Sequence, residues 1–85
     1  MFINKADKGY HNICGAAVEK RRKELKKSQR ELADMLQIAG LDIDKNAVQR
    51  IEARKRFVTD IELVYLAKVL GLSYEALLSA QSEQT

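Results

Sequence analysis

The strongest constraint on the fold is a pair of helix start signals in one short stretch, residues 28–52, which reads "SQRELADMLQIAGLDIDKNAVQRIE". Ser28 and Glu31 form a capping box, in which each side chain accepts a hydrogen bond from the other residue's backbone N–H. Asp44 is a good N-cap, and its carboxylate also suits the positive end of a helix dipole. Gly40 lies between the two signals and indicates a turn at positive φ. The sequence therefore predicts two short helices joined by a turn.

Apolar residues at helical spacing give each of these helices an inner face. The first helix should run to about Ile38, and its apolar face is Leu32, Ala33 and Leu36. In the second helix Val48 and Ile51 point one way, and Ile43 stands in the hydrophobic-staple position opposite Val48. The pair is typical of a helix-turn-helix unit.

Three further helices are predicted around this pair. The stretch 12–27 has a thin apolar stripe at helical spacing. Thr59 and Glu62 form a second capping box, and Gly71 ends the helix that they open. Ser73 is the N-cap of a last short helix. We expect the helix after Thr59 to be the most buried, with apolar positions Ile61, Leu63, Val64, Leu66, Ala67 and Leu70.

These elements predict an all-α fold, a compact bundle of about five short helices in one domain over residues 12–79. Helix formers dominate the 85 residues and proline is absent. Residues 1–11 are expected to form a flexible N-terminal arm, and residues 80–85 a frayed C-terminal tail. Chains shorter than about 70–80 residues gain only about 3–5 kcal/mol from their cores, so self-association would help a chain little longer than that.

Charge is distributed unevenly along the chain. Residues 1–58 carry 14 Lys and Arg against 8 Asp and Glu, whereas residues 59–85 carry 1 against 4. A basic N-terminal part and an acidic C-terminal part indicate that one side of the protein binds a polyanion such as nucleic acid, although a solvated helix face gives the same pattern.

The residue content disfavours catalysis and a membrane location. Cys14, the only cysteine, cannot form an internal disulfide, and we expect it to be a small buried hydrophobe near a helix start. His11 is the only histidine, and metal-ligand spacing, a phosphate-binding glycine loop and a catalytic triad are absent from the sequence. We therefore expect no enzyme activity, no metal and no cofactor. Because no apolar run approaches the roughly 20 residues that span a bilayer, and "MFINKADKGYHN" is too charged for a secretory signal, we expect a cytoplasmic protein.

The predicted helix after Asp44 carries side chains suited to the edges of DNA bases. Asn46 and Gln49 can bond adenine through two hydrogen bonds, and Lys45 and Arg50 can donate to guanine. A recognition helix enters the major groove with such residues near its N-terminal end. Exposed helix faces also carry these residue types for solubility alone, so the row by itself leaves both interpretations open.

Four segments carry a resemblance to a known family: "VEKRR", "SQRELA", "AVQRIEARKR" and "ELVYLAKVLGLSYEALL". From about Val18 to Leu78 the chain resembles the phage repressor and Cro-like helix-turn-helix family, also called the XRE family. The resemblance implies a lambda-repressor-like domain. It also implies a sequence-specific transcription regulator that binds double-stranded DNA, a repressor, acting as a homodimer on two half-sites.

The resemblance also implies roles for individual residues. It places Lys45, Asn46, Gln49 and Arg50 at the base-contacting positions. It pairs Arg22 with Glu52 in a salt bridge that would orient the recognition helix more than stabilise the fold. The residues expected to contact phosphates are Gln29, Arg54, Lys55, Arg56 and Thr59. For the run "ARKR", and for Lys26 and Lys27, a solvated loop is the alternative.

Two features depart from the family pattern. The turn "QIAGLDI" is longer than usual, so either the first helix of the pair runs on to Ile38 or Ala39, or a small loop bulges out. Arg54 stands where the family has a C-cap glycine, so either it adopts a left-handed conformation at about 1 kcal/mol or the helix ends differently.

A protein-interaction module of the same fold, such as an antitoxin-like subunit, is the alternative function. It would need an exposed apolar patch, which we expect either around Tyr65 or on the last helix, with Tyr74, Leu77 and Leu78. The other interpretation is that these residues pack in the core. For a homodimer, the last helix with Tyr74 and Leu78 is the expected interface.

Overall fold

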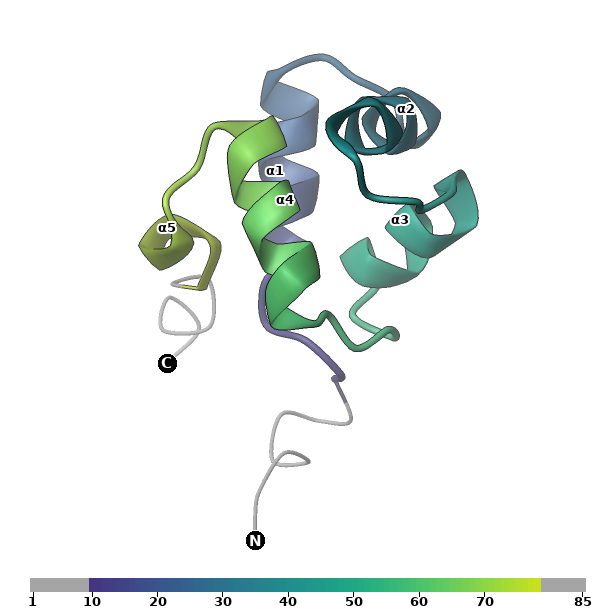
Figure 1. The fold of residues 1–85 in the computed structure, drawn as a ribbon. Coiled ribbons are helices and arrows are strands. Elements are labelled where there is room, and N and C mark those ends of the chain that lie inside the picture. Colours follow the sequence, from purple (N-terminus) through teal and green to yellow (C-terminus); the bar gives the residue numbers. More distant parts are fainter. Residues whose placement is uncertain (1–9, 79–85) are drawn as a thin grey trace, which may run out of the picture.

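A computed structural model describes residues 10–78 of the chain (Figure 1). Within this part the chain is entirely helical, as the sequence predicts, with α1 (Gly15–Glu24), α2 (Gln29–Ala39), α3 (Lys45–Glu52), α4 (Asp60–Leu70) and α5 (Tyr74–Leu78). Residues 1–9 of the predicted arm, and the predicted tail 80–85, lie outside the described residues. In Figure 1, α1 and α4 occupy the centre, α2 and α3 lie on one side of them and α5 on the other.

Helix starts follow the local signals in the sequence. Ser28, Asp44, Thr59 and Ser73 each accept a hydrogen bond from the backbone N–H three residues later, at 2.8–3.1 Å. The capping boxes at Ser28 and Thr59 are complete, because the glutamate side chain of each box accepts the N–H of its cap residue. Each cap contributes about 1 kcal/mol, and together they fix where the helices begin.

The ends of α1, α2, α3 and α4 share one geometry, a left-handed residue followed by a backbone N–H that bonds back to the last full turn. Glycine supplies the left-handed residue after α2 and α4, with φ of 119° at Gly40 and 67° at Gly71. After α1 and α3 the residue is Lys26 at 61° and Arg54 at 62°. Arg54 therefore adopts the left-handed conformation, the first of the two predicted alternatives, and Lys26 carries the same strain of about 1–2 kcal/mol.

The first helix is shorter than predicted, Gly15–Glu24 in place of 12–27. At its start the N-cap is Cys14, whose side chain makes no capping bond, and the Asn12 side-chain oxygen accepts the Gly15 N–H at 2.9 Å, so Asn12 lies outside the helix. At its end Lys26 turns left-handed, and the N–H of Lys27 bonds to the carbonyl of Arg22. Both differences come from hydrogen bonds to the backbone, which an apolar stripe does not encode.

The core lies between the inner faces of the helices. Its buried members are Cys14, Val18, Leu32, Ala33, Leu36, Ile43, Val48, Ile51, Leu66, Ala67, Leu70 and Leu77. Cys14 is buried as predicted, and desolvation raises the pKa of its thiol to about 11. The thiol therefore stays protonated at neutral pH, which removes its nucleophilicity.

The sequence predicts that α4 is the most buried helix, but it has three buried residues, as α1, α2 and α3 do, and two of its six apolar positions are exposed. Ile61 is 64% exposed and Val64 is 47% exposed. They lie on the side of α4 opposite Leu66 and Leu70, which face the core. In the part of the chain that the structure describes, no helix has the length and apolar character needed to cross a bilayer.

Candidate nucleic-acid interface

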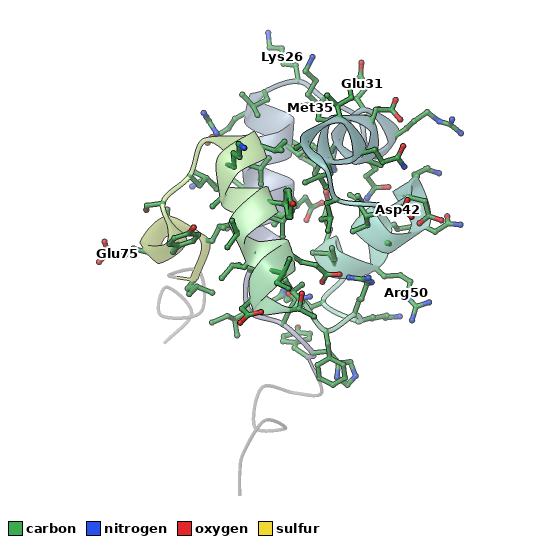
Figure 2. The ribbon with its side chains drawn as sticks, in the orientation of Figure 1. Lys26, Glu31, Met35, Asp42, Arg50 and Glu75 are labelled. Carbon is green, nitrogen blue, oxygen red and sulfur yellow. The ribbon has the colours of Figure 1, made fainter. Side chains whose placement is uncertain are left out.

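The four predicted base-contacting side chains all lie on the outer face of α3. Lys45, Asn46, Gln49 and Arg50 are exposed, whereas Val48 and Ile51 on the other face are each 1% exposed. Figure 2 shows Arg50 pointing away from the bundle. The cap at Asp44 and the buried Ile43 and Val48 fix the rotation of the helix that turns this row outward.

A buried ion pair ties α3 to α1. Arg22 donates from Nε to Oε2 of Glu52 at 2.7 Å and from Nη2 to Oε1 at 3.0 Å. The two side chains are 11% and 4% exposed. Arg22 also donates to the Lys27 carbonyl at 2.8 Å, and the hydrogen bond to Glu52 raises the pKa of the Arg22 guanidinium. The salt bridge expected from the sequence is therefore present in the two-donor geometry that restricts the angle between helices.

Gln29 adds α2 to the same carboxylate. Its Nε2 donates to Oε1 of Glu52 at 3.0 Å. One of its two amide hydrogens is thus used inside the protein, which leaves one for the phosphate contact that the resemblance implies. Glu52 consequently joins three helices, α1, α2 and α3, at one point.

The longer turn between α2 and α3 is held by hydrogen bonds. α2 runs on to Ala39, one of the two expected outcomes, and Gly40 takes the predicted positive φ. The Gln37 amide donates to the carbonyl of Ile43 at 2.6 Å, and the Ile43 side chain is 4% exposed. The extra length therefore does not loosen the pair. It does place an exposed carboxylate, Asp42, beside α3 (Figure 2).

The three cations after α3 have different surroundings. The Arg54 guanidinium lies 4.0 Å from the centre of the Tyr10 ring, a cation–π contact. Arg56 pairs with Glu62, with Nη1 and Oε1 2.9 Å apart. The Lys55 side chain is exposed and has no ion pair or hydrogen bond within residues 10–78. Lys55 is therefore the cation of this loop with most freedom to meet a phosphate.

The start of α4 is less suited to a phosphate than the sequence suggests. The Thr59 hydroxyl accepts the Glu62 N–H, and the Thr59 N–H donates to the Glu62 carboxylate. Asp60 adds a second carboxylate to the first turn. Because these groups satisfy the helix N-terminus and repel an anion, we leave Thr59 out of the interface proposed below.

Asn12 is a residue near the interface that the sequence analysis did not single out. Its side-chain amide donates to the carbonyls of Ile51 and Arg56 at 3.2 and 2.8 Å. Its bond to the Gly15 N–H spans three residues and is local, but its bonds to Ile51 and Arg56 depend on the tertiary fold.

Lys26 projects from the top of Figure 2, away from Arg50 at lower right.

Comparison with known proteins gives one positive finding. A family model described as helix-turn-helix matches residues 18–77, which contain α2, α3, α4 and the turns between them. Neither a curated protein nor a solved structure matches the chain. No group of three or more metal-ligating side chains occurs within residues 10–78.

Proposed function

The chain belongs to the XRE family of helix-turn-helix domains, and on that premise we propose that it is a sequence-specific repressor that reads double-stranded DNA with α3. The family is one of DNA-binding transcription regulators. Beyond DNA binding, we propose which residues contact the bases, which contact the phosphates, that the protein represses transcription, and that it forms a dimer.

One observation carries the proposal: the exposed row of Lys45, Asn46, Gln49 and Arg50 on a helix whose other face is buried. These side chains match the donors and acceptors that base pairs present in the major groove. The Glu52 junction of three helices supports their orientation, since it limits the angle at which α3 leaves the bundle.

Phosphate contacts would supply most of the affinity and base contacts most of the discrimination. We propose Lys55 as the principal phosphate contact, because its charge has no partner among the described residues. Arg54 and Gln29 can contribute through the hydrogens that Tyr10 and Glu52 leave available. Arg56 contributes less, because Glu62 neutralises it.

Selection of duplexes from a random pool, followed by titrations of the selected site, tests this function. Gln49→Ala should weaken the selected site by about 1–3 kcal/mol and leave random duplexes unaffected. Lys55→Ala should weaken all duplexes alike and flatten the salt dependence by about one unit. Lys68→Ala, which removes an exposed lysine from α4, is the matched control and should change neither. Absence of duplex binding by the wild type at low salt would refute the proposal.

We also propose a homodimer that uses α5. Tyr74 and Leu78 are 52% and 40% exposed, which leaves apolar surface for a second copy, whereas Leu77 is fully buried and belongs to the core. Two copies would read two half-sites about one helical turn apart. Sedimentation of the wild type and of Tyr74→Ser/Leu78→Ser tests this, and a wild type that stays monomeric on its DNA site would contradict it.

A protein-interaction module is the second candidate function. Ile61 and Val64 on α4 favour it, since both are apolar and are 64% and 47% exposed. Duplex selection separates the two functions, because a pure interaction module would enrich no sequence.

A further inference from the structure

The segment before α1 is bonded to the loop that follows α3. The His11 N–H donates to the Arg54 carbonyl at 2.9 Å, and the Asn12 amide donates to the Arg56 carbonyl at 2.8 Å. These bonds hold the backbone on both sides of Lys55. The rings of His11 and Phe57 also contact each other, with centroids 4.4 Å apart.

Asn12 is the central residue of this connection. Its amide hydrogens go to the Ile51 and Arg56 carbonyls, and its oxygen accepts the Gly15 N–H. One side chain therefore links the start of α1, the end of α3 and the loop. The helices meet closely here, because a Cβ on Gly15 would collide with the Ile51 carbonyl oxygen.

Of the three cations in this loop, Lys55 is the one whose side chain is exposed and has no ion pair or hydrogen bond among the described residues. The guanidinium of Arg54 is held on Tyr10 and that of Arg56 on Glu62, while the Lys55 N–H bonds to the Arg50 carbonyl. The Lys55 backbone is thus fixed from within α3 and from both neighbouring carbonyls. Only its side chain remains to be ordered on binding, which lowers the entropy lost at that step.

We infer that Asn12 is a positioning residue for DNA binding: it fastens residues 54–56 to the start of α1 and thereby presents Lys55 to the phosphate backbone. The consequence for DNA rests on the proposed function, whereas the fastening itself does not. Asn12 touches no DNA in this account, so it should influence affinity for every sequence and preference for none.

The fastening is tested without DNA by limited trypsin digestion of the full chain. Asn12→Ser keeps an oxygen that can accept the Gly15 N–H but is too short to reach the two carbonyls, and Asn12→Asp keeps the shape but has no hydrogens to donate. Both variants should be cut after Lys55 several-fold faster than the wild type, with cutting after Lys26 unchanged. Ser73→Ala, which removes the cap of α5, controls for general loss of stability. Equal cutting after Lys55 in Asn12→Ser, Asn12→Asp and wild type would overturn the inference.

The consequence for DNA is tested by titrating a mixed-sequence duplex at several salt concentrations. Loss of one phosphate contact reduces the slope by about 0.9 and weakens binding about eightfold at about 0.1 M salt. Asn12→Ser should approach the loss seen in Lys55→Ala, and the double variant should lose little more. Base preference, measured by selection, should stay at its wild-type pattern.

The outcomes separate the inference from the function beneath it. A wild type that binds no duplex refutes the proposed function. The digestion experiment then tests only whether Asn12 anchors residues 54–56 to the start of α1. A wild type that binds, with full additivity of Asn12→Ser and Lys55→Ala in the double variant, overturns the positioning role. A changed base preference in Asn12→Ser would also overturn it, because the residue would then act through α3.

Discussion

Truncation of Arg22 should destabilise the fold severely, whereas replacing the whole ion pair should not. Arg22→Ala leaves Glu52 as a charge that is 4% exposed, with Gln29 as its remaining donor. Breaking one partner of a buried pair costs about 3–5 kcal/mol, and the Lys27 carbonyl loses its donor as well. At about 0.05–0.15 kcal/mol per residue, the chain has about 4–13 kcal/mol in total. The single substitution therefore removes a large part of the stability.

The apolar replacement Arg22→Met/Glu52→Leu separates stability from orientation. It removes both buried charges and roughly keeps their volume, so its unfolding free energy should be well above that of Arg22→Ala and near the wild-type value, even though the Lys27 carbonyl loses its donor in both variants. Sequence-specific DNA binding should nevertheless weaken, because a directional, two-donor contact no longer fixes the angle between α1 and α3.

Urea unfolding followed by circular dichroism, together with titration of the selected duplex, measures both effects. A loss below about 1 kcal/mol in Arg22→Ala would refute the reasoning from burial. Wild-type DNA affinity and preference in Arg22→Met/Glu52→Leu would refute the orienting role. The charge reversal Arg22→Glu/Glu52→Arg is a further check, since it should restore part of what each single reversal loses.

Three further predictions concern local features. Lys26→Gly should raise the unfolding free energy by about 1 kcal/mol, because glycine adopts the φ of 61° without strain, and an unchanged urea midpoint would contradict this. The hydrogen bond from the Ser28 N–H lowers the pKa of the Glu31 carboxyl in the folded protein. The charged carboxylate therefore stabilises the fold at pH values above the pKa of the unfolded chain, which is about 4.3. This stabilisation is lost as the pH falls through the lower pKa of the folded state. Glu31→Gln should therefore be less stable than the wild type at neutral pH and equal to it in acid, and a stability difference that is the same at both pH values would exclude the charge as its cause. The Cys14 thiol, with a pKa of about 11, should react with a disulfide reagent only as fast as the protein unfolds, and rapid reaction of the folded protein at neutral pH would show that the residue is not enclosed.

Helix starts could be predicted from sequence because their chemistry is local. The caps at Ser28, Asp44, Thr59 and Ser73 each join a side chain to a backbone group three residues away. The helix ends at Gly40 and Gly71 could also be predicted from the sequence, since glycine is the residue that most often adopts the left-handed conformation at a helix end. The end at Lys26 was not predicted, because lysine gives no such signal.

The exposure of Ile61 and Val64 could not be inferred from a broad apolar stripe. Such a stripe shows that a helix can be buried, but the neighbours decide which part of it is covered. Here Leu66 and Leu70 are buried in the core, and Ile61 and Val64 on the opposite side of α4 are exposed to solvent.

The candidate interface was predictable to the extent that it lies on one helix. A cap and an apolar face set the rotation of α3, and with it the direction of Gln49 and Arg50. The surroundings of the loop cations were not predictable in this way. The bond from Asn12 to the Arg56 carbonyl joins residues 44 positions apart, and only the packed fold brings them together.

The central claim is that the outer face of α3 enters the major groove, and methylation interference on the selected duplex tests it most directly. One methylating reagent modifies guanine at N7 in the major groove and adenine at N3 in the minor groove. The account predicts that N7 methylation of guanines in the site blocks binding, that N3 methylation of adenines is tolerated, and that Arg50→Ala removes part of the N7 effect. Interference from adenine N3 alone would contradict the account.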